Sequence, residues 1–225
     1  MSALAFDRVD AGGFRGASFA VAPGELVVLE AATGADAGTL LRLLVGSAQP
    51  EAGAVALLGE PLAGIAEARR LALLARTGVV WGDGGFLSNL KAWENILLPL
   101  WYHGDERAER REEEVLALLG RLGVGPDRVA GFLAAMPASL PTRERRILGV
   151  ARAMLPDAEA MIYAELFDGL DAATRALLLG ETARHHERRE GRATLFVASG
   201  AEGLPEPFAG TSLRQTPEGR FGPWD

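Results

Sequence analysis

The chain has 225 residues, 48% of them hydrophobic and 24% charged, a composition typical of one large globular domain or two small ones. The formal net charge of −7 argues against a broad nucleic-acid surface, so we expect no nucleic-acid partner. The lack of cysteine excludes disulfides and thiolate metal sites, and no apolar run is long enough to span a membrane. No export signal is visible at the N-terminus, so we expect a cytoplasmic protein.

The N-terminal part is predicted to be rich in β-strands. Three segments have strand-like length and pattern: ALAFDRV, GASFAVA and ELVVLEA. A helix is expected over TLLRLLVG, with Gly46 as its stop signal. A short strand and turn follow over residues 54–62, and an apolar strand over 76–83.

The middle of the chain is predicted to be helical. In REEEVLALLGRLGV the apolar positions Val115, Leu118, Leu119 and Leu122 follow the i, i+3, i+4, i+7 spacing of an amphipathic helix. Another helix is expected over 141–155, with proline at its first helical position.

Strands and helices alternate again towards the C-terminus. AMIYAEL and ATLFVAS read as buried strands, the segment DAATRALLLGETARHHERR between them reads as a helix with a basic end, and TSLRQTPEGRFG reads as a terminal hairpin. Buried strands that alternate with helices indicate a largely parallel sheet in an α/β layer fold.

Residues 26–44, LVVLEAATGADAGTLLRLL, have the layout of a phosphate-binding P-loop: a buried strand, a loop of small residues and an apolar helix. A P-loop uses a lysine to reach the β- and γ-phosphates and a Ser/Thr hydroxyl to bind Mg²⁺. This loop has no lysine and contains an aspartate, and the single lysine of the chain, Lys91, lies in another segment.

The order of five segments resembles the nucleotide-binding domain of ABC transporters. They are the P-loop stretch with its PEAG and GEPL turns, TGVVWGDGGFLSNLKAWENILLPLWYHG as the Q-loop segment, RRILGVARAML as the helix after the signature motif, MIYAEL as the Walker B strand, and FDGLDAATRALL as the D-loop. The resemblance implies one domain over 1–225. Its fold would be an α/β P-loop NTPase of ABC type: a mostly parallel sheet flanked by helices, an N-terminal antiparallel β part and a helical subdomain over roughly 84–152.

The resemblance also shows where the family's chemistry is missing. Gly34 and Thr39 match the P-loop pattern, but Ala37 stands at the lysine position and Gly38 at the magnesium-ligand position. Asp36 replaces the glycine before the lysine. A carboxylate there would face the phosphates, at a cost of roughly 1 to 4 kcal/mol at about 4 Å.

The other motifs of the family are altered in parallel. Gly82 replaces the Q-loop glutamine, Ala164 the Walker B aspartate and Gly200 the switch histidine, whereas Glu165 keeps the catalytic glutamate position. The signature LSGGQ reads SLPTR at 139–143, where Leu140 replaces the serine hydroxyl and Pro141 removes a backbone N–H from the helix start.

Each of these residues also has a structural interpretation. Glu165 is expected to be a hydrogen-bonded carboxylate near a strand end rather than a base that polarises water. Thr39 is expected to cap its helix rather than bind an α-phosphate. Asp171 either supports the D-loop turn or contacts a partner subunit.

Three further groups of residues are candidates for binding. Charges at positions 143, 145 and 146 read as a solvated helix face, and His185 and His186 as exposed residues at a basic helix end. We expect Trp93, with Leu90, to line the groove that receives a permease helix, and Trp101 and Tyr102 to lie in the core.

We therefore expect an ATP-binding subunit that docks on a membrane permease at the inner face of the cell membrane, pairs with a second ATPase subunit, or does both. Little or no ATP hydrolysis is expected, with Mg-ATP bound weakly if at all and no other cofactor or metal. The segment ENILLPLWYHG is similar to ATPases of MCE-type lipid-transport systems, which suggests a lipid cargo. Two alternatives stay open: a weak ATPase in which Arg42 or a partner residue replaces the lysine, and a soluble regulatory or scaffold protein.

Overall fold

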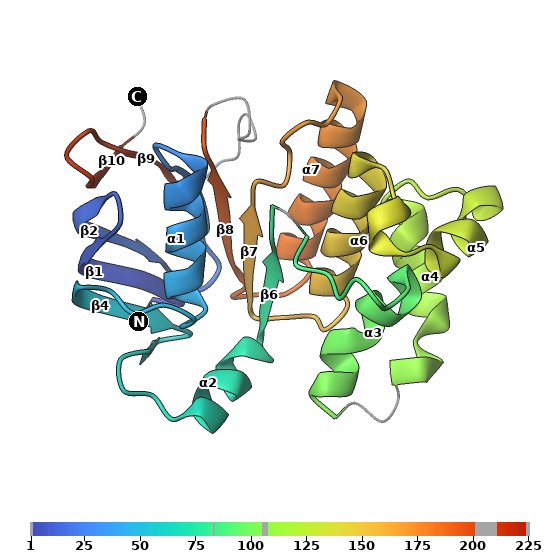
Figure 1. Cartoon of the computed structure of the whole chain (residues 1–225), viewed down its shortest axis with the longest axis horizontal. Helices are drawn as coiled ribbons and strands as arrows, with labels where there is room; N and C mark the ends of the chain where they lie inside the picture. Colours follow the sequence, from blue (N-terminus) through green and yellow to red (C-terminus); the bar gives the residue numbers. More distant parts are fainter. Residues whose placement is uncertain (1, 83, 105–107, 201–210, 224–225) are drawn as a thin grey trace.

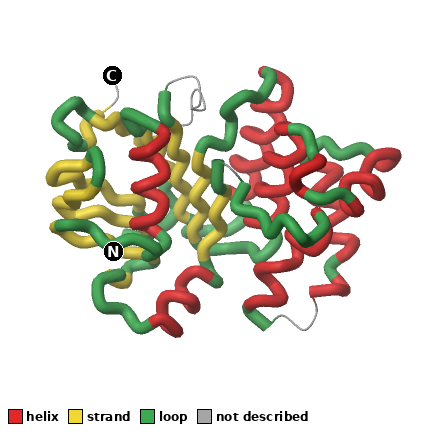
Figure 2. Tube along the Cα trace, in the orientation of Figure 1, coloured by secondary structure: helices red, strands yellow, loops and turns green. Residues whose placement is uncertain are grey.

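The computed structural model of the chain describes residues 2–82, 84–104, 108–200 and 211–223. Figure 1 shows an antiparallel sheet on the left, a second sheet near the middle and a group of helices on the right. The tube view in Figure 2 separates the strand-rich and the helix-rich parts clearly. An ABC-type α/β P-loop fold, as expected from the sequence, is confirmed.

The smaller sheet is antiparallel and has the order β2-β1-β4-β5. Its strands are β1 (Leu4–Ala11), β2 (Phe14–Val21), β4 (Ala52–Leu57) and β5 (Glu60–Pro61). Inward-facing residues alternate along β2 with exposed ones, as expected for a sheet with one face on the core.

The larger sheet has the order β10-β9-β3-β8-β7-β6, and only the β10–β9 pair is antiparallel. Its strands are β3 (Leu26–Glu30), β6 (Thr77–Val80), β7 (Ala160–Ala164), β8 (Ala193–Ala198), β9 (Thr211–Gln215) and β10 (Phe221–Pro223). β7 and β8 are buried throughout because both faces of the sheet are covered.

The two faces of this sheet belong to two hydrophobic cores. Along β3, Val27 and Leu29 pack with α1 (Gly34–Leu44) and the antiparallel sheet. Val28, on the opposite face, packs with the helices on the other side. This division follows from the two-residue period of a strand.

In the part of the chain that the structure describes, six more α-helices follow α1. They are α2 (Glu67–Leu74), α3 (Ala92–Tyr102), α4 (Glu112–Arg121), α5 (Pro126–Ala134), α6 (Thr142–Met154) and α7 (Ala172–Glu187). The apolar face predicted for α4 is confirmed, since all four of its residues are buried. The predicted start of α6 is shifted by one residue, because Pro141 is the N-cap and not the first helical residue. The α1 helix begins at Gly34, earlier than the apolar pattern from Thr39 suggests.

Candidate functional site

Four strands of the larger sheet end at the same edge because they run parallel. There β3 leads into α1, β6 into Trp81 and Gly82, β7 into Glu165, and β8 into Ser199. Segments that are far apart in the sequence thus meet around the N-terminal part of α1.

A cavity of about 520 Å³, here called the P-loop cavity, lies among three of these segments. It is lined by Gly34, Ala37, Gly38, Leu41, Arg42, Ser47, Trp81, Gly82, Ala164 and Glu165. Of these described lining residues, Arg42 is the one cation and Glu165 the one carboxylate. Most of the wall is apolar or glycine.

The start of α1 is capped by Thr33, so the expectation that Thr39 caps this helix is wrong. Thr33 Oγ1 accepts a hydrogen bond from the Asp36 N–H at 3.1 Å and donates to the Asp36 carboxylate at 2.8 Å. The Asp36 carboxylate also lies against Gly13 in the β1–β2 turn, and it is not part of the cavity wall. Thr39, one turn into the helix, donates its hydroxyl to the Ala35 carbonyl and accepts from Arg42 Nη2 at 3.0 Å.

Glu165 has a backbone φ of 54°, an uncommon value for a residue with a side chain. Its Oε1 accepts a hydrogen bond from the Ser199 N–H at 3.1 Å. Burial, followed by a hydrogen bond to Glu165, raises the pKa of Asp168 to about 6. No group of three or more side chains suited to hold a metal ion is found in the part of the chain that the structure describes.

The family model for ABC transporters matches residues 14–167. The chain belongs to the ABC transporter family. The methionine import ATP-binding protein MetN 2 of Paraburkholderia xenovorans (strain LB400) is 34% identical over 159 residues, which are 71% of this chain and 40% of that protein. The taurine import ATP-binding protein TauB of Chromobacterium violaceum is 35% identical over 182 residues, 78% of this chain and 64% of that protein.

The chain thus spans less than two thirds of the length of either relative. A solved dimeric structure of a bacterial ABC transporter cassette superposes with a TM-score of 0.79 at 17% identity, over 96% of this chain and 95% of that one. At this identity the superposition supports the ABC fold alone.

The motif positions expected for the family can now be located in and around the P-loop cavity. Ala37, which the sequence comparison assigned to the lysine position as an expectation, is 1% exposed and lies in the wall. Gly38, expected at the magnesium-ligand position, lies in the same wall. A Cβ atom on Gly82, the residue expected at the glutamine position, would lie 2.9 Å from Glu165 Cβ, so the backbone at Gly82 packs directly onto this glutamate. Gly200, the residue expected at the histidine position, is the last described residue before position 211.

The signature segment lies where a short 3-10 helix (Pro137–Ser139) meets α6. Leu140 is buried. The arginines that follow do not form the solvated face expected from the sequence, since all three are half-buried. Arg146 donates hydrogen bonds to the carbonyls of Gly82 and Asp168, so it ties α6 to the Q-loop and the D-loop.

Two further expectations about α7 can be compared with the structure. Asp171 is its N-cap and accepts from the Thr174 N–H at 2.9 Å, which supports the D-loop turn; a contact with a partner stays a prediction. The expected exposure of the two histidines is wrong. His185 is buried beside α4 and the end of α6, and His186 is half-buried with Nδ1 2.9 Å from Thr194 Oγ1 on β8.

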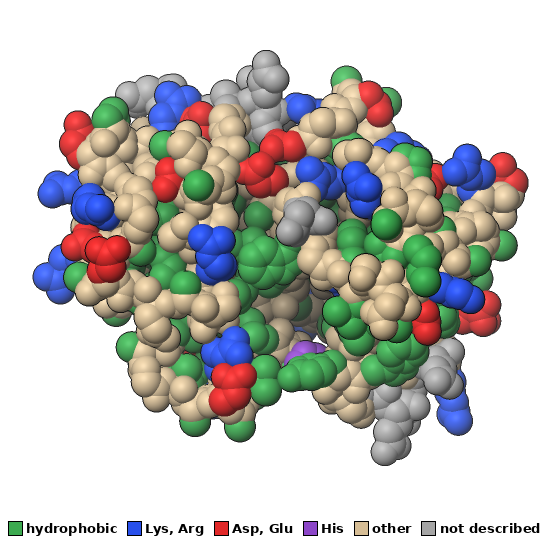
Figure 3. Space-filling view, viewed as in Figure 1, with side chains coloured by type: hydrophobic (Ala, Val, Ile, Leu, Met, Phe, Trp, Pro, Cys, Tyr) green, Lys and Arg blue, Asp and Glu red, His purple; other side chains and the backbone are tan. Residues whose placement is uncertain are grey.

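A second cavity, of about 480 Å³, is the docking-groove candidate between α2, β6 and α3. Its wall is mainly apolar and includes Leu74, Trp81, Leu87, Leu98, Pro99 and Tyr102. Figure 3 shows hydrophobic side chains gathered around a hollow in the middle of one face of the molecule. Within the described residues, no helix has both the length and the apolarity that crossing a membrane requires.

The burial of the aromatic residues around this groove differs from what the sequence predicted. Trp101 and Tyr102, expected in the core, are 38% and 66% exposed, because they end α3 and few elements pack over them. Trp93 is half-buried against the helical core, and neither it nor Leu90 lines the groove. Leu87 and Tyr102 do line the groove. The sequence analysis did not predict a docking role for either residue, although Tyr102 lies in the segment ENILLPLWYHG.

Proposed function

We propose that this chain is the ATP-binding subunit of a membrane transport complex with little or no ATP hydrolysis of its own. In this complex it docks on a permease subunit at the cytoplasmic face of the membrane and pairs with a second ABC ATPase subunit, identical or different. Membership of the ABC transporter family supports the transport role, and the two relatives are named as import ATP-binding proteins.

The composition of the P-loop cavity supports the proposal that the chain binds Mg-ATP weakly and hydrolyses it little or not at all. Mg²⁺ is held by oxygen ligands, and the cavity offers side-chain oxygens only from Ser47 and Glu165. The polyphosphate of ATP needs cations and oriented N–H groups, whereas the wall near the start of α1 presents Ala37 and Gly38. These residues do not fit Mg-ATP well, so we assign no hydrolytic step to Glu165.

The apolar groove supports docking on a permease. Leu87 is 47% exposed and Tyr102 is 66% exposed, and both line the same concave wall with Pro99. Exposed apolar and aromatic side chains around a groove are typical of a surface that receives an amphipathic helix. A short cytoplasmic helix of the permease is the occupant that we propose.

Copurification from membranes tests this docking. Leu87→Asp and Tyr102→Asp should release the permease, because each places a charge in the apolar wall. Leu116→Asp is the matched control, since Leu116 is 36% exposed on α4 and outside the groove. Retention of the permease by both groove variants at wild-type yield would reject the groove as the docking site.

Leu90 and Trp93 can be tested in the same assay. We expect charged substitutions there to release the permease as well, because both residues follow Leu87 within six positions of the chain. Glu165→Gln should leave assembly and transport almost unchanged. Loss of transport in cells with Glu165→Gln would show that the glutamate still has a catalytic role.

The relatives named for methionine and taurine import favour a small solute as cargo. A lipid cargo is supported only by the segment ENILLPLWYHG. Uptake assays with labelled solutes in a deletion strain distinguish these cargoes.

One observation favours a second candidate function, a weak ATPase. Arg42 lines the P-loop cavity, and its guanidinium reaches back along α1 to the Thr39 hydroxyl, one turn into the helix. If Arg42 replaces the lysine, Arg42→Gln should abolish any ATPase activity that the complex retains. Activity that is unchanged in Arg42→Gln would exclude this role.

A further inference from the structure

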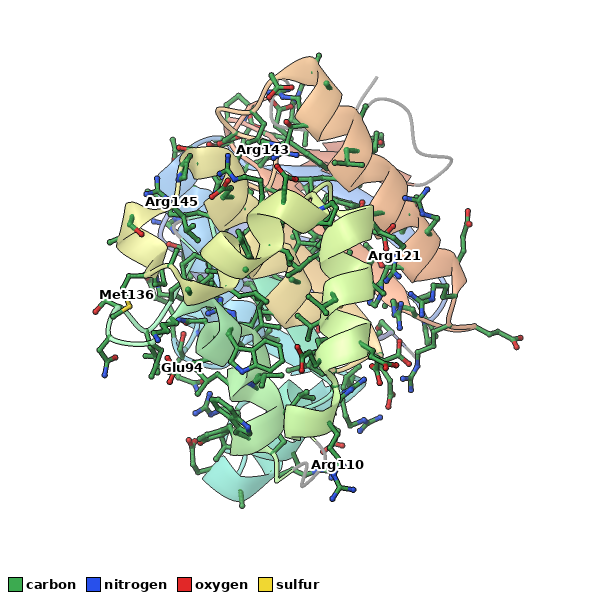
Figure 4. The ribbon with its side chains drawn as sticks, turned by 90° about the vertical axis from the view of Figure 1, so that its right-hand side faces the viewer. Glu94, Arg110, Arg121, Met136, Arg143 and Arg145 are labelled. Carbon is green, nitrogen blue, oxygen red and sulfur yellow. The ribbon has the colours of Figure 1, made fainter. Side chains whose placement is uncertain are left out.

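A polar cavity of about 380 Å³ lies among α4, the C-terminal ends of α6 and α7, and the turn after α6. We call it the α4–α7 cavity; its polar lining residues are Arg111, Glu114, Arg121, Asp157, His185 and Arg188. None of them lines the P-loop cavity or the docking groove. In Figure 4, Arg121 lies on the right-hand side of the helical part and Arg145 on its left-hand side.

Positive charge exceeds negative charge around this cavity. Glu181, 2% exposed, is shared by two arginines, with Arg121 and Arg184 both at 2.8 Å. Asp157 is likewise shared, between Arg192 and Arg189. Arg111 pairs with Glu114 at 2.7 Å, and Arg189 also contacts Glu159 at 3.3 Å. Glu181 and Asp157 each compensate two guanidinium groups only in part, and Arg188 adds one more cation to the wall. In a chain with a net charge of −7, this concentration of arginine is local.

Hydrogen-bond donors remain available at the same place. Arg121 donates only its Nε to Glu181 among the bonds observed, so its two terminal nitrogens can serve a ligand. His185 is 4% exposed, and its Nε2 has no hydrogen-bond partner among the described residues. Burial and then the charge of Arg192 lower the pKa of His185 to about 3, so the ring is neutral and carries one N–H.

We propose that the α4–α7 cavity binds a small molecule that carries a phosphate group. Guanidinium forks match phosphate oxygens in geometry and charge, and the cavity volume lies in the range of small-ligand sites. The bound phosphate would compensate the excess positive charge and accept hydrogen bonds from Arg121, Arg188 and His185. This site lies beyond the proposed transport role and does not depend on it.

Calorimetric titration with inorganic phosphate and with glycerol 3-phosphate tests the site in the full chain. We expect at least one of them to bind, and Arg188→Gln and Arg121→Gln each to weaken binding by about tenfold or more, the effect of losing one charge-assisted hydrogen bond. Arg145→Gln is the matched control, since Arg145 does not line this cavity, and Arg42→Gln reports on phosphate bound in the P-loop cavity instead. Arg188 is exposed, so its substitution should not disturb folding, which circular dichroism checks.

Nitrogen NMR of the histidine side chains gives a second readout. The chain has three histidines, and His185→Gln assigns the relevant signal. Phosphate should shift the His185 ring signals and leave those of His103 unchanged. The proposal is overturned if neither compound binds at millimolar concentration, if Arg188→Gln and Arg121→Gln bind like the wild type, or if Arg42→Gln alone abolishes binding, which would place the phosphate in the P-loop cavity.

Discussion

Glu165 and Asp168 are two carboxyl groups that share a hydrogen bond just after β7. Asp168 keeps its proton in the folded protein up to about pH 6, whereas its usual pKa is 3.8. The folded state therefore binds more protons than the unfolded chain between these values. The contribution of Asp168 to stability is largest at low pH and falls as the pH rises from about 4 to about 6.

Asp168→Asn should remove this dependence on pH. The amide cannot ionise but can still donate to Glu165, so we expect the variant to be about 1 to 2 kcal/mol more stable than the wild type near pH 7, with the difference shrinking towards about pH 4. Urea denaturation at several pH values measures it. Asp7→Asn, at an exposed carboxylate, is the control and should change little. A variant that loses stability near neutral pH would contradict this assignment.

Ala37→Lys is the simplest repair of the P-loop, and we expect it to fail. Mg²⁺ would still lack two ligands, because Gly38 has no hydroxyl and Ala164 has no carboxylate. Gly82 cannot easily be restored to glutamine, because a Cβ there already meets Glu165 at 2.9 Å. Residues that act as a unit recover little when one of them is repaired.

Phosphate-release assays on the purified variant, with the wild type as control, check this expectation. ATPase activity close to that of an ordinary transporter subunit would mean that the other departures do not matter.

Helix α1 depends on its cap, which the structure places at Thr33. Thr33→Ala should lower the free energy of unfolding by about 0.5 to 2 kcal/mol, because the Asp36 N–H loses its partner. Thr39→Ala is the matched control: its hydroxyl bonds back to the Ala35 carbonyl, and alanine favours the helix, so we expect little loss. Chemical denaturation distinguishes the two, and a larger loss for Thr39→Ala would reverse the assignment.

Periodicity predicted the strongly patterned elements and missed the weak ones. β7 and β8 are continuous apolar runs that suit a strand buried on both faces, and α4 has an apolar face that suits a helix. By contrast, α2 and α5 each bury a single residue, Leu73 and Phe132, so their sequences carry little helical pattern. The burial of His185 was missed because it depends on α4 and α6, which are distant in sequence.

At the scale of the molecule, the P-loop cavity and the docking groove lie on either side of Trp81, which lines both, and the α4–α7 cavity shares no lining residue with them. The order of the family's segments was enough to predict the ABC fold, whereas the altered motif positions that it assigns stay a prediction. It could not predict that Arg146 and Arg152 hold the Q-loop backbone, because those bonds join residues more than 60 positions apart. Nor could it predict which side chains line the groove.

The central claim is that the chain keeps the ABC fold and has lost most of its affinity for Mg-ATP. Each charge-assisted hydrogen bond lost from the phosphate site removes about 1.5 to 3 kcal/mol, and several are absent together. Isothermal titration calorimetry of the purified chain with Mg-ATP tests this most directly. We predict no binding in the micromolar range; a saturable micromolar affinity for Mg-ATP would contradict the account.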